Sequence, residues 1–171
     1  MDDEHRAQTF AALRKTVGVT AKALFDAGSK RIEKALAGGG MQPSHRAAKV
    51  LRCAELADEF SDGNLDKVLP TLDEKLRRRL LKRFPGIADP SADKLLLVCD
   101  LAASPTLDSN GLRVLRTLGY CRTWVAYTAG YKAGVARLRE YKILGPKALE
   151  AFALPRAHGR ELNLSLINER G

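Results

Sequence analysis

Residues 77–119 read RRRLLKRFPGIADPSADKLLLVCDLAASPTLDSNGLRVLRTLG. A basic segment over 77–84 runs into Pro85 and Gly86, a pair that marks a change of chain direction. Glycine at such a turn lets the backbone approach phosphate oxygens, and a helix that begins after the turn directs amide groups towards negative charge. The stretch therefore predicts two helices joined by a tight turn that could hold a sugar-phosphate backbone.

The second half of this stretch brings one acid to the start of a further helix. The segment over 92–101 is apolar on nearly all faces, which predicts a helix buried in the core. After a break, Asp108, Ser109 and Asn110 form a cluster typical of a helix N-cap, and a helix is predicted over 111–118. Asp108 has two compatible interpretations: a cap for that helix, or a carboxylate that acts on a ligand held by the turn.

Helical periodicity dominates the rest of the chain, and we find no alternating pattern that would indicate a strand. Ser44 and Ser91 are expected to cap the helices that follow them, and Gly28 to interrupt the second helical segment. The other helices are predicted over 5–17, 20–26, 28–37, 45–60, 72–84, 123–141, 146–153 and 156–168. These patterns predict an all-α fold.

The charge of the chain favours an anionic partner. Lysine and arginine total 29 against 20 acidic residues, a net charge of +9, and nucleic acid is the partner class that such an excess favours. The basic run over 77–83 fits either DNA contact or a solvated helix face. No run of 18 apolar residues occurs, and the N-terminus is polar, so no membrane span is expected and a cytoplasmic, nucleoid-associated monomer is the expectation.

The cysteines and aromatics give weaker indications. Cys53, Cys99 and Cys121 are widely spaced within apolar helical patterns and are predicted to be buried free thiols. Neither their spacing nor that of the histidines indicates a metal site, and no cofactor is expected.

Three aromatic side chains share one face of the helix predicted over 123–141. Trp124, Tyr127 and Tyr131 are spaced by three and four residues, which places them side by side. They fit packing in the core, and they also fit a platform on which bases could stack.

Three segments together resemble the endonuclease III-like, or HhH-GPD, DNA glycosylases. FPGIADPSADKLLL over 84–97 resembles the helix-hairpin-helix of that family, and LDSNGLRVL over 107–115 stands where the family has its aspartate and the following helix. LPRAHGREL over 154–162 is similar to a late family helix with a His-Gly pair.

The similarity covers roughly residues 20–165 and implies an all-α fold of two helical lobes with a cleft between them. One lobe would span 20–103 and end in the helix-hairpin-helix, with its hairpin at about 84–91. The other would combine 1–19 with 104–171.

The resemblance implies a DNA repair glycosylase that flips a damaged or mispaired base from duplex DNA and hydrolyses its N-glycosidic bond. Asp108 would be its essential catalytic carboxylate. The residues implied in DNA binding are Arg83, Gly86, Ile87, Ala88, Ser91 and Lys94. Further candidates for base or phosphate contacts are Asn110, Tyr127 and Tyr131.

Some positions depart from the family pattern. Pro90 stands where bifunctional members carry the lysine that forms a Schiff base, so a monofunctional enzyme without lyase activity is implied. Asn163 stands at the first cysteine of the family's iron–sulfur cluster, so no cluster is implied. Ala88 replaces the second hairpin glycine, and would cost about 1 kcal/mol if that position needed a positive φ. Gln8 does not align with the residue that fills the gap left by a flipped base, so no wedge is assigned.

Two alternatives remain open at this stage. The chain could be a non-catalytic helix-hairpin-helix module that binds DNA or senses lesions. It could also be a helical adaptor whose basic face meets an acidic protein. The identity of the recognised base is not indicated by the sequence.

Overall fold

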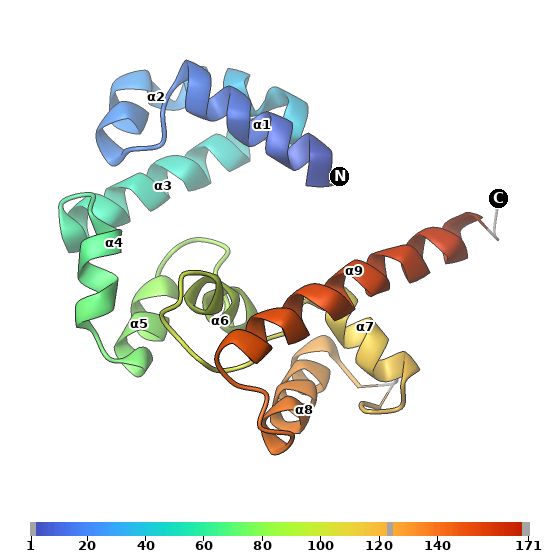
Figure 1. Cartoon of the computed structure of the whole chain (residues 1–171). Helices are drawn as coiled ribbons and strands as arrows, with labels where there is room; N and C mark the ends of the chain where they lie inside the picture. Colours follow the sequence, from blue (N-terminus) through green and yellow to red (C-terminus); the bar gives the residue numbers. More distant parts are fainter. Residues whose placement is uncertain (1–2, 123–124, 169–171) are drawn as a thin grey trace. The chain divides into compact units, whose positions relative to one another are not determined.

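The computed structural model describes residues 3–122 and 125–168. Across these residues the regular structure consists of nine α-helices and two short 3-10 helices, without a strand, so the predicted all-α class is confirmed (Figure 1). Among the described helices none is both long and apolar enough to cross a membrane. The chain forms two compact units: Met1–Asp73 with Arg83–Gly86, called unit 1, and Glu74–Lys82 with Ile87–Gly171, called unit 2.

Unit 1 is built on the packing of α2 along α3, with α1 against α2 (Figure 1). Its helices are α1 (Asp3–Thr16), α2 (Ala21–Leu36), η1 (Ala37–Gly39), α3 (Pro43–Ser61), α4 (Leu65–Val68) and η2 (Leu69–Thr71). Its buried core consists of Leu13, Leu24, Ile32, Leu36, Ala47 and Ala54. Because Leu13 of α1 belongs to this core, α1 packs within unit 1, which differs from the expected lobe that combined 1–19 with 104–171.

Glycine and proline set the helix boundaries of unit 1. Gly28 has φ 68° and ψ 172° within α2, so the predicted interruption of this segment is confirmed. α3 begins at Pro43, behind Gln42 with φ 55°, and the predicted cap at Ser44 is wrong because Ser44 lies inside the first turn. Proline already has a helical φ and needs no partner for a missing N–H, which favours this earlier start.

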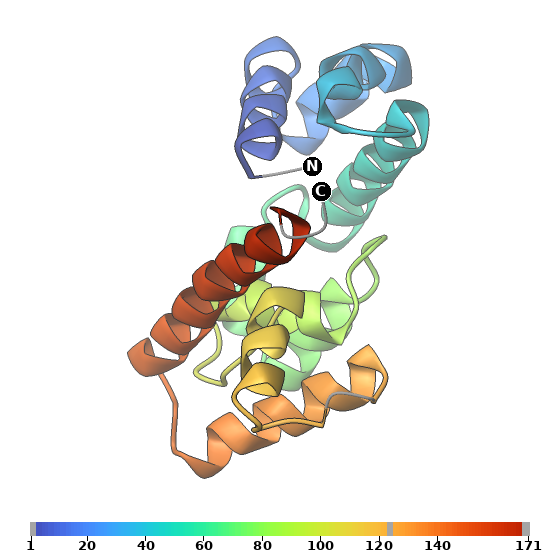
Figure 2. The ribbon, with the colours of Figure 1, turned by 90° about the vertical axis from the view of Figure 1, so that its right-hand side faces the viewer.

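In unit 2, α7 lies along α9 in both ribbon views (Figures 1 and 2). The helices of this unit are α5 (Glu74–Leu81), α6 (Asp89–Val98), α7 (Ser109–Thr117), α8 (Tyr127–Glu140) and α9 (Pro146–Asn168). One core cluster consists of Leu107, Leu112, Leu115, Cys121, Tyr131 and Val135. A smaller cluster joins α6 to α9 through Leu97, Ala148 and Phe152.

The two helices predicted over 146–153 and 156–168 form one helix, α9, with Pro155 inside it. Proline lacks a backbone N–H and usually kinks or breaks a helix, but α9 makes packing contacts both before and after Pro155. Phe152 is buried before Pro155, and Gly159 approaches the backbone of α7 after it. Packing on both sides keeps the helix continuous.

α6 differs from its prediction at both its start and its surface. It begins at Asp89, so Ser91 lies within the first turn and is not the cap. The helix is not buried all round, because Leu95 and Val98 are 38% and 59% exposed while Leu96 is buried. Leu95 and Val98 are three residues apart and therefore share one face, which the core of unit 2 leaves uncovered.

Candidate functional site

Asp108 is positioned by a buried segment that leads into α7. Pro105, Thr106 and Leu107 are almost entirely buried, and Leu107 belongs to the larger core cluster of unit 2. Thr106 Oγ1 also lies 3.3 Å from the Tyr131 hydroxyl. These contacts fix the backbone on one side of Asp108, and its own side chain is half-buried.

The Asp108 carboxylate caps α7 as predicted. Its Oδ1 accepts hydrogen bonds from the amides of Asn110 at 3.0 Å and Gly111 at 2.9 Å. Two amides at a helix N-terminus that lack helical partners are thereby satisfied, and the helix dipole favours the negative charge. Oδ1 therefore has a structural role, whatever the role of the second oxygen.

The second oxygen of Asp108 meets a cation from α9. Arg156 Nε donates to Asp108 Oδ2 at 2.8 Å, and the side chains of Arg156 and Asp108 are 32% and 21% exposed. The Arg156 guanidinium also lies 6.0 Å from the centre of the Phe152 ring. Both carboxylate oxygens are thus held by groups of unit 2, and the carboxylate retains partial access to solvent.

Tyr127 and Tyr131 form a stacked pair on α8. Their ring centroids are 6.4 Å apart with an interplanar angle of 27°. Tyr131 is buried, whereas Tyr127 is 42% exposed. Burial and the nearby Asp108 charge raise the pKa of Tyr127, so its phenol is neutral at physiological pH. Tyr131 is therefore a core residue and Tyr127 presents its ring at the surface, while Trp124 lies outside the described residues.

A partly buried hydrogen bond and an ion pair, both made by Asp93, tie α8 to the two helices of the hairpin. The Tyr131 hydroxyl donates to Asp93 Oδ2 at 2.5 Å, and Arg78 Nε lies 2.7 Å from Asp93 Oδ1. Burial and the hydrogen bond to Asp93 raise the pKa of Tyr131 well above its ordinary value. Because Asp93 on α6 contacts Arg78 on α5 and Tyr131 on α8, it ties these three helices together.

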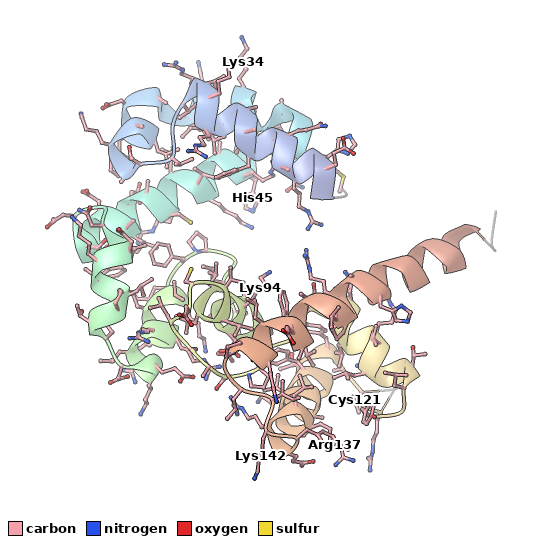
Figure 3. All side chains as sticks on the ribbon, in the orientation of Figure 1. Lys34, His45, Lys94, Cys121, Arg137 and Lys142 are labelled. Atoms are coloured by element: carbon pink, nitrogen blue, oxygen red, sulfur yellow. The ribbon has the colours of Figure 1, made fainter. Side chains whose placement is uncertain are left out.

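The hairpin turn has the backbone conformation that its glycine predicts. Gly86 has φ 87°, and a Cβ at this position would meet no atom within 4 Å, so the need for glycine lies in the backbone conformation. Ala88 has φ −103° and ψ 180°, an extended conformation open to any residue, so alanine carries no strain there. Ile87 and Ser91 are half-buried, as is Lys94 on α6 (Figure 3).

Several side chains of the basic run are engaged within the protein. The guanidinium of Arg83 lies 4.3 Å from the centre of the Phe60 ring, and its Nη2 is 3.9 Å from Glu59 Oε1. Lys82 Nζ lies 2.7 Å from Asp89 Oδ1, and this hydrogen bond lowers the pKa of Asp89. The run over 77–83 therefore joins helices as well as carrying charge.

The remaining candidates have ordinary surroundings. Cys121 is buried against α8 (Figure 3) and Cys53 is half-buried, but Cys99 is exposed at the end of α6, so its predicted burial is wrong. Within the described residues no group of three or more His, Cys, Asp or Glu side chains could hold a metal ion.

The structure gathers one subset of the predicted residues in unit 2: Asp108, Asn110 and Tyr127, with Tyr131 beneath Tyr127. Asn110 Oδ1 accepts from Arg113 Nη1 at 3.3 Å. Arg156 was not predicted, since it lies 48 residues from Asp108 and no local pattern indicates such a pair. Asp93 was likewise missed, because an acid within an apolar helix gives no sign of its partners.

No family model matches this chain, and a search of curated proteins returns no relative. The function is therefore proposed from the geometry around Asp108, from the hairpin and from charge.

Proposed function

We propose that this protein is a monofunctional DNA glycosylase that acts on duplex DNA with a damaged or mispaired base. The observation that carries the proposal is the placement of Asp108. Its carboxylate is half-buried and fixed at the start of α7, and its charge adds to the effect of burial in raising the pKa of the Tyr127 phenol. A charged acid beside a neutral, partly exposed aromatic ring suits a nucleoside, which offers a flat base and a sugar that becomes positively charged during cleavage.

In the proposed reaction the bond between the base nitrogen and C1′ of the sugar breaks, and its electron pair leaves with the base. Positive charge builds on the sugar, and Asp108 stabilises it or takes a proton from the attacking water. The water oxygen bonds to C1′, and the proton lost by water balances the proton gained by the base. Pro90 offers no amine to the sugar, so no Schiff base forms.

The hairpin is proposed to hold the phosphate backbone of the DNA. Gly86 allows a tight turn with no side chain to obstruct a close approach, and the unstrained Ala88 leaves that turn intact. Most of the lysine and arginine residues, but fewer than half of the acidic ones, belong to unit 2, which therefore carries nearly all of the net charge of +9. Such an excess attracts DNA in a salt-dependent way.

The proposal is tested by base release from duplexes that each contain one lesion or mismatch. Wild-type protein should release free base from at least one duplex and leave an intact abasic strand. Asp108→Asn should lower the rate about 100-fold or more, because asparagine retains the cap but removes the charge. Asp100→Asn, at an exposed aspartate of the same unit, is the matched control and should retain the wild-type rate.

A second candidate function is a DNA-binding or lesion-sensing module without chemistry. The observation in its favour is that both oxygens of Asp108 already have partners within unit 2, as those of a purely structural acid would. This candidate requires duplex binding with no base release from any lesion.

Binding itself depends on the hairpin in both candidates. Gly86→Glu should weaken duplex binding about tenfold or more, since it adds a negative charge and strains a backbone with positive φ. Lys15→Glu, a larger charge change at an exposed position of α1, should weaken it much less. If Gly86→Glu binds as wild type does in a gel-shift titration at low salt, the hairpin is not the DNA contact.

A further inference from the structure

Asp108 could rotate about its side-chain bonds if only its cap contacts held it. Oδ1 is bound by two amides of α7, and Arg156 Nε binds Oδ2 from a different helix at 2.8 Å. A carboxylate has about four lone-pair sites, and these three hydrogen bonds leave capacity on Oδ2 for one further contact. The partly exposed face of Asp108 is where that contact would be made.

Arg156 is itself held in place. It is four residues after Phe152, so the two side chains lie on one face of α9, and the guanidinium is 6.0 Å from the Phe152 ring. Phe152 is buried in the cluster with Leu97 and Ala148. A guanidinium has a planar set of donors in fixed directions, which makes it better suited than an ammonium to orient a carboxylate.

We propose that Arg156 is the positioning residue of this site: it orients the Asp108 carboxylate so that one lone pair of Oδ2 faces the sugar of the bound nucleotide. The inference rests on the proposed function, and it adds a residue that acts on the reaction through Asp108. A positioned carboxylate stabilises developing positive charge without rearranging during the reaction, which is the source of most electrostatic catalysis. The same contact could have the opposite effect. If the guanidinium only neutralised the charge of Asp108, it would slow base release, and its removal would speed the reaction.

The sign of the effect on base release separates these roles. Arg156→Ala should lower kcat about tenfold and leave KM within about twofold, because the carboxylate loses orientation while DNA contacts remain. Arg156→Lys should recover part of the loss. In an Asp108→Asn background, Arg156→Ala should cause no further loss, since its partner is already changed.

Arg113→Ala provides a matched control. Arg113 also joins α7 to α9, through a 3.0 Å hydrogen bond from Nη1 to the carbonyl of Gly159, but its other hydrogen bond goes to Asn110 Oδ1 and not to Asp108. Its replacement should leave kcat within about threefold of wild type. Unchanged or increased kcat in Arg156→Ala overturns the positioning role, as does an equal loss in the Asp108→Asn background.

If the wild-type protein releases no base, the proposed function is wrong. The positioning of Asp108 by Arg156 can then still be tested by a measurement that does not depend on catalysis. Hydrogen exchange at the Asn110 and Gly111 amides reports directly on how firmly Asp108 Oδ1 is held. Arg156→Ala should speed exchange at both amides about threefold or more relative to Arg113→Ala. Equal exchange in the two variants means that Arg156 does not position Asp108.

Discussion

A single carboxylate in unit 2 bonds to two backbone amides through one oxygen and to a guanidinium through the other. The two amides belong to α7 and the guanidinium belongs to α9, so two helices hold the carboxylate. The combination explains how an aspartate within reach of solvent is kept in one orientation. It also explains why asparagine is the informative replacement, because it keeps the cap and loses the charge.

Ionisation of the buried Tyr131 phenol makes the stability of the folded protein depend on pH in the alkaline range. Its pKa is raised in the folded protein, whereas an unfolded tyrosine has a pKa of about 10. The stabilisation is therefore fully present below about pH 10 and is lost as pH rises above that value towards the folded pKa. Wild type should lose about 1 kcal/mol of unfolding free energy per pH unit above pH 10 through this residue.

Urea unfolding followed by circular dichroism at pH 7, 9, 10 and 11 measures this effect. At pH 7, Tyr131→Phe should be less stable by about 1–2 kcal/mol, because the bonds to Asp93 and Thr106 are lost. The difference from wild type should narrow above pH 10. Tyr120→Phe, which removes an exposed phenol, serves as the control. A difference that stays constant from pH 7 to 11 would contradict the assigned role of the buried hydroxyl.

At the scale of helices, the crossing of α7 and α9 depends on Gly159. A Cβ on Gly159 would lie 2.4 Å from the backbone carbonyl oxygen of Asn110, so the two helices could not keep their separation. Gly159→Ala should lower the unfolding free energy by about 2 kcal/mol or more and should loosen the bond between Asp108 and Arg156.

Gly38→Ala is the comparison for this variant. A Cβ on Gly38 meets no atom within 4 Å, so the change should leave stability within about 1 kcal/mol. The same urea titration measures both proteins. Equal midpoints for the two variants would show that the close crossing at Gly159 is not required.

Helix boundaries could be predicted from the sequence where the residue at the boundary itself determines the local conformation. The interruption at Gly28, the turn at Gly86 and the cap at Asp108 were all predictable, because each depends on the residue itself. The starts of α3 and α6 were misplaced, since a proline in the first turn outweighed the serine that looked like a cap. The continuity of α9 through Pro155 was not predictable, because it depends on packing against distant residues.

At the scale of the whole molecule, the all-α class was predictable from periodicity and the division into units was not. The sequence of α1 does not indicate which helices it packs against. It is assigned to unit 1 because Leu13 shares a buried core with Ile32. The same limit applies to the candidate site. Asp108 and Tyr127 were found from sequence, but Arg156 required the fold, because the bond joins helices far apart in the chain.

The distribution of charge gives the molecule a basic unit 2 and a nearly neutral unit 1. The candidate acid, its guanidinium partner and the two helices of the hairpin all belong to the basic unit. A unit with an excess of cations attracts DNA in a salt-dependent way, which is what the proposed function requires of it.

The most direct test of the central claim is a single-turnover measurement of base release with saturating enzyme, paired with a binding titration on the same lesion duplex. For Asp108→Asn the account predicts a rate at least about 100-fold below wild type, with a Kd within about twofold. Equal rates for the two proteins at equal affinity would contradict it, because the carboxylate would then take no part in breaking the glycosidic bond.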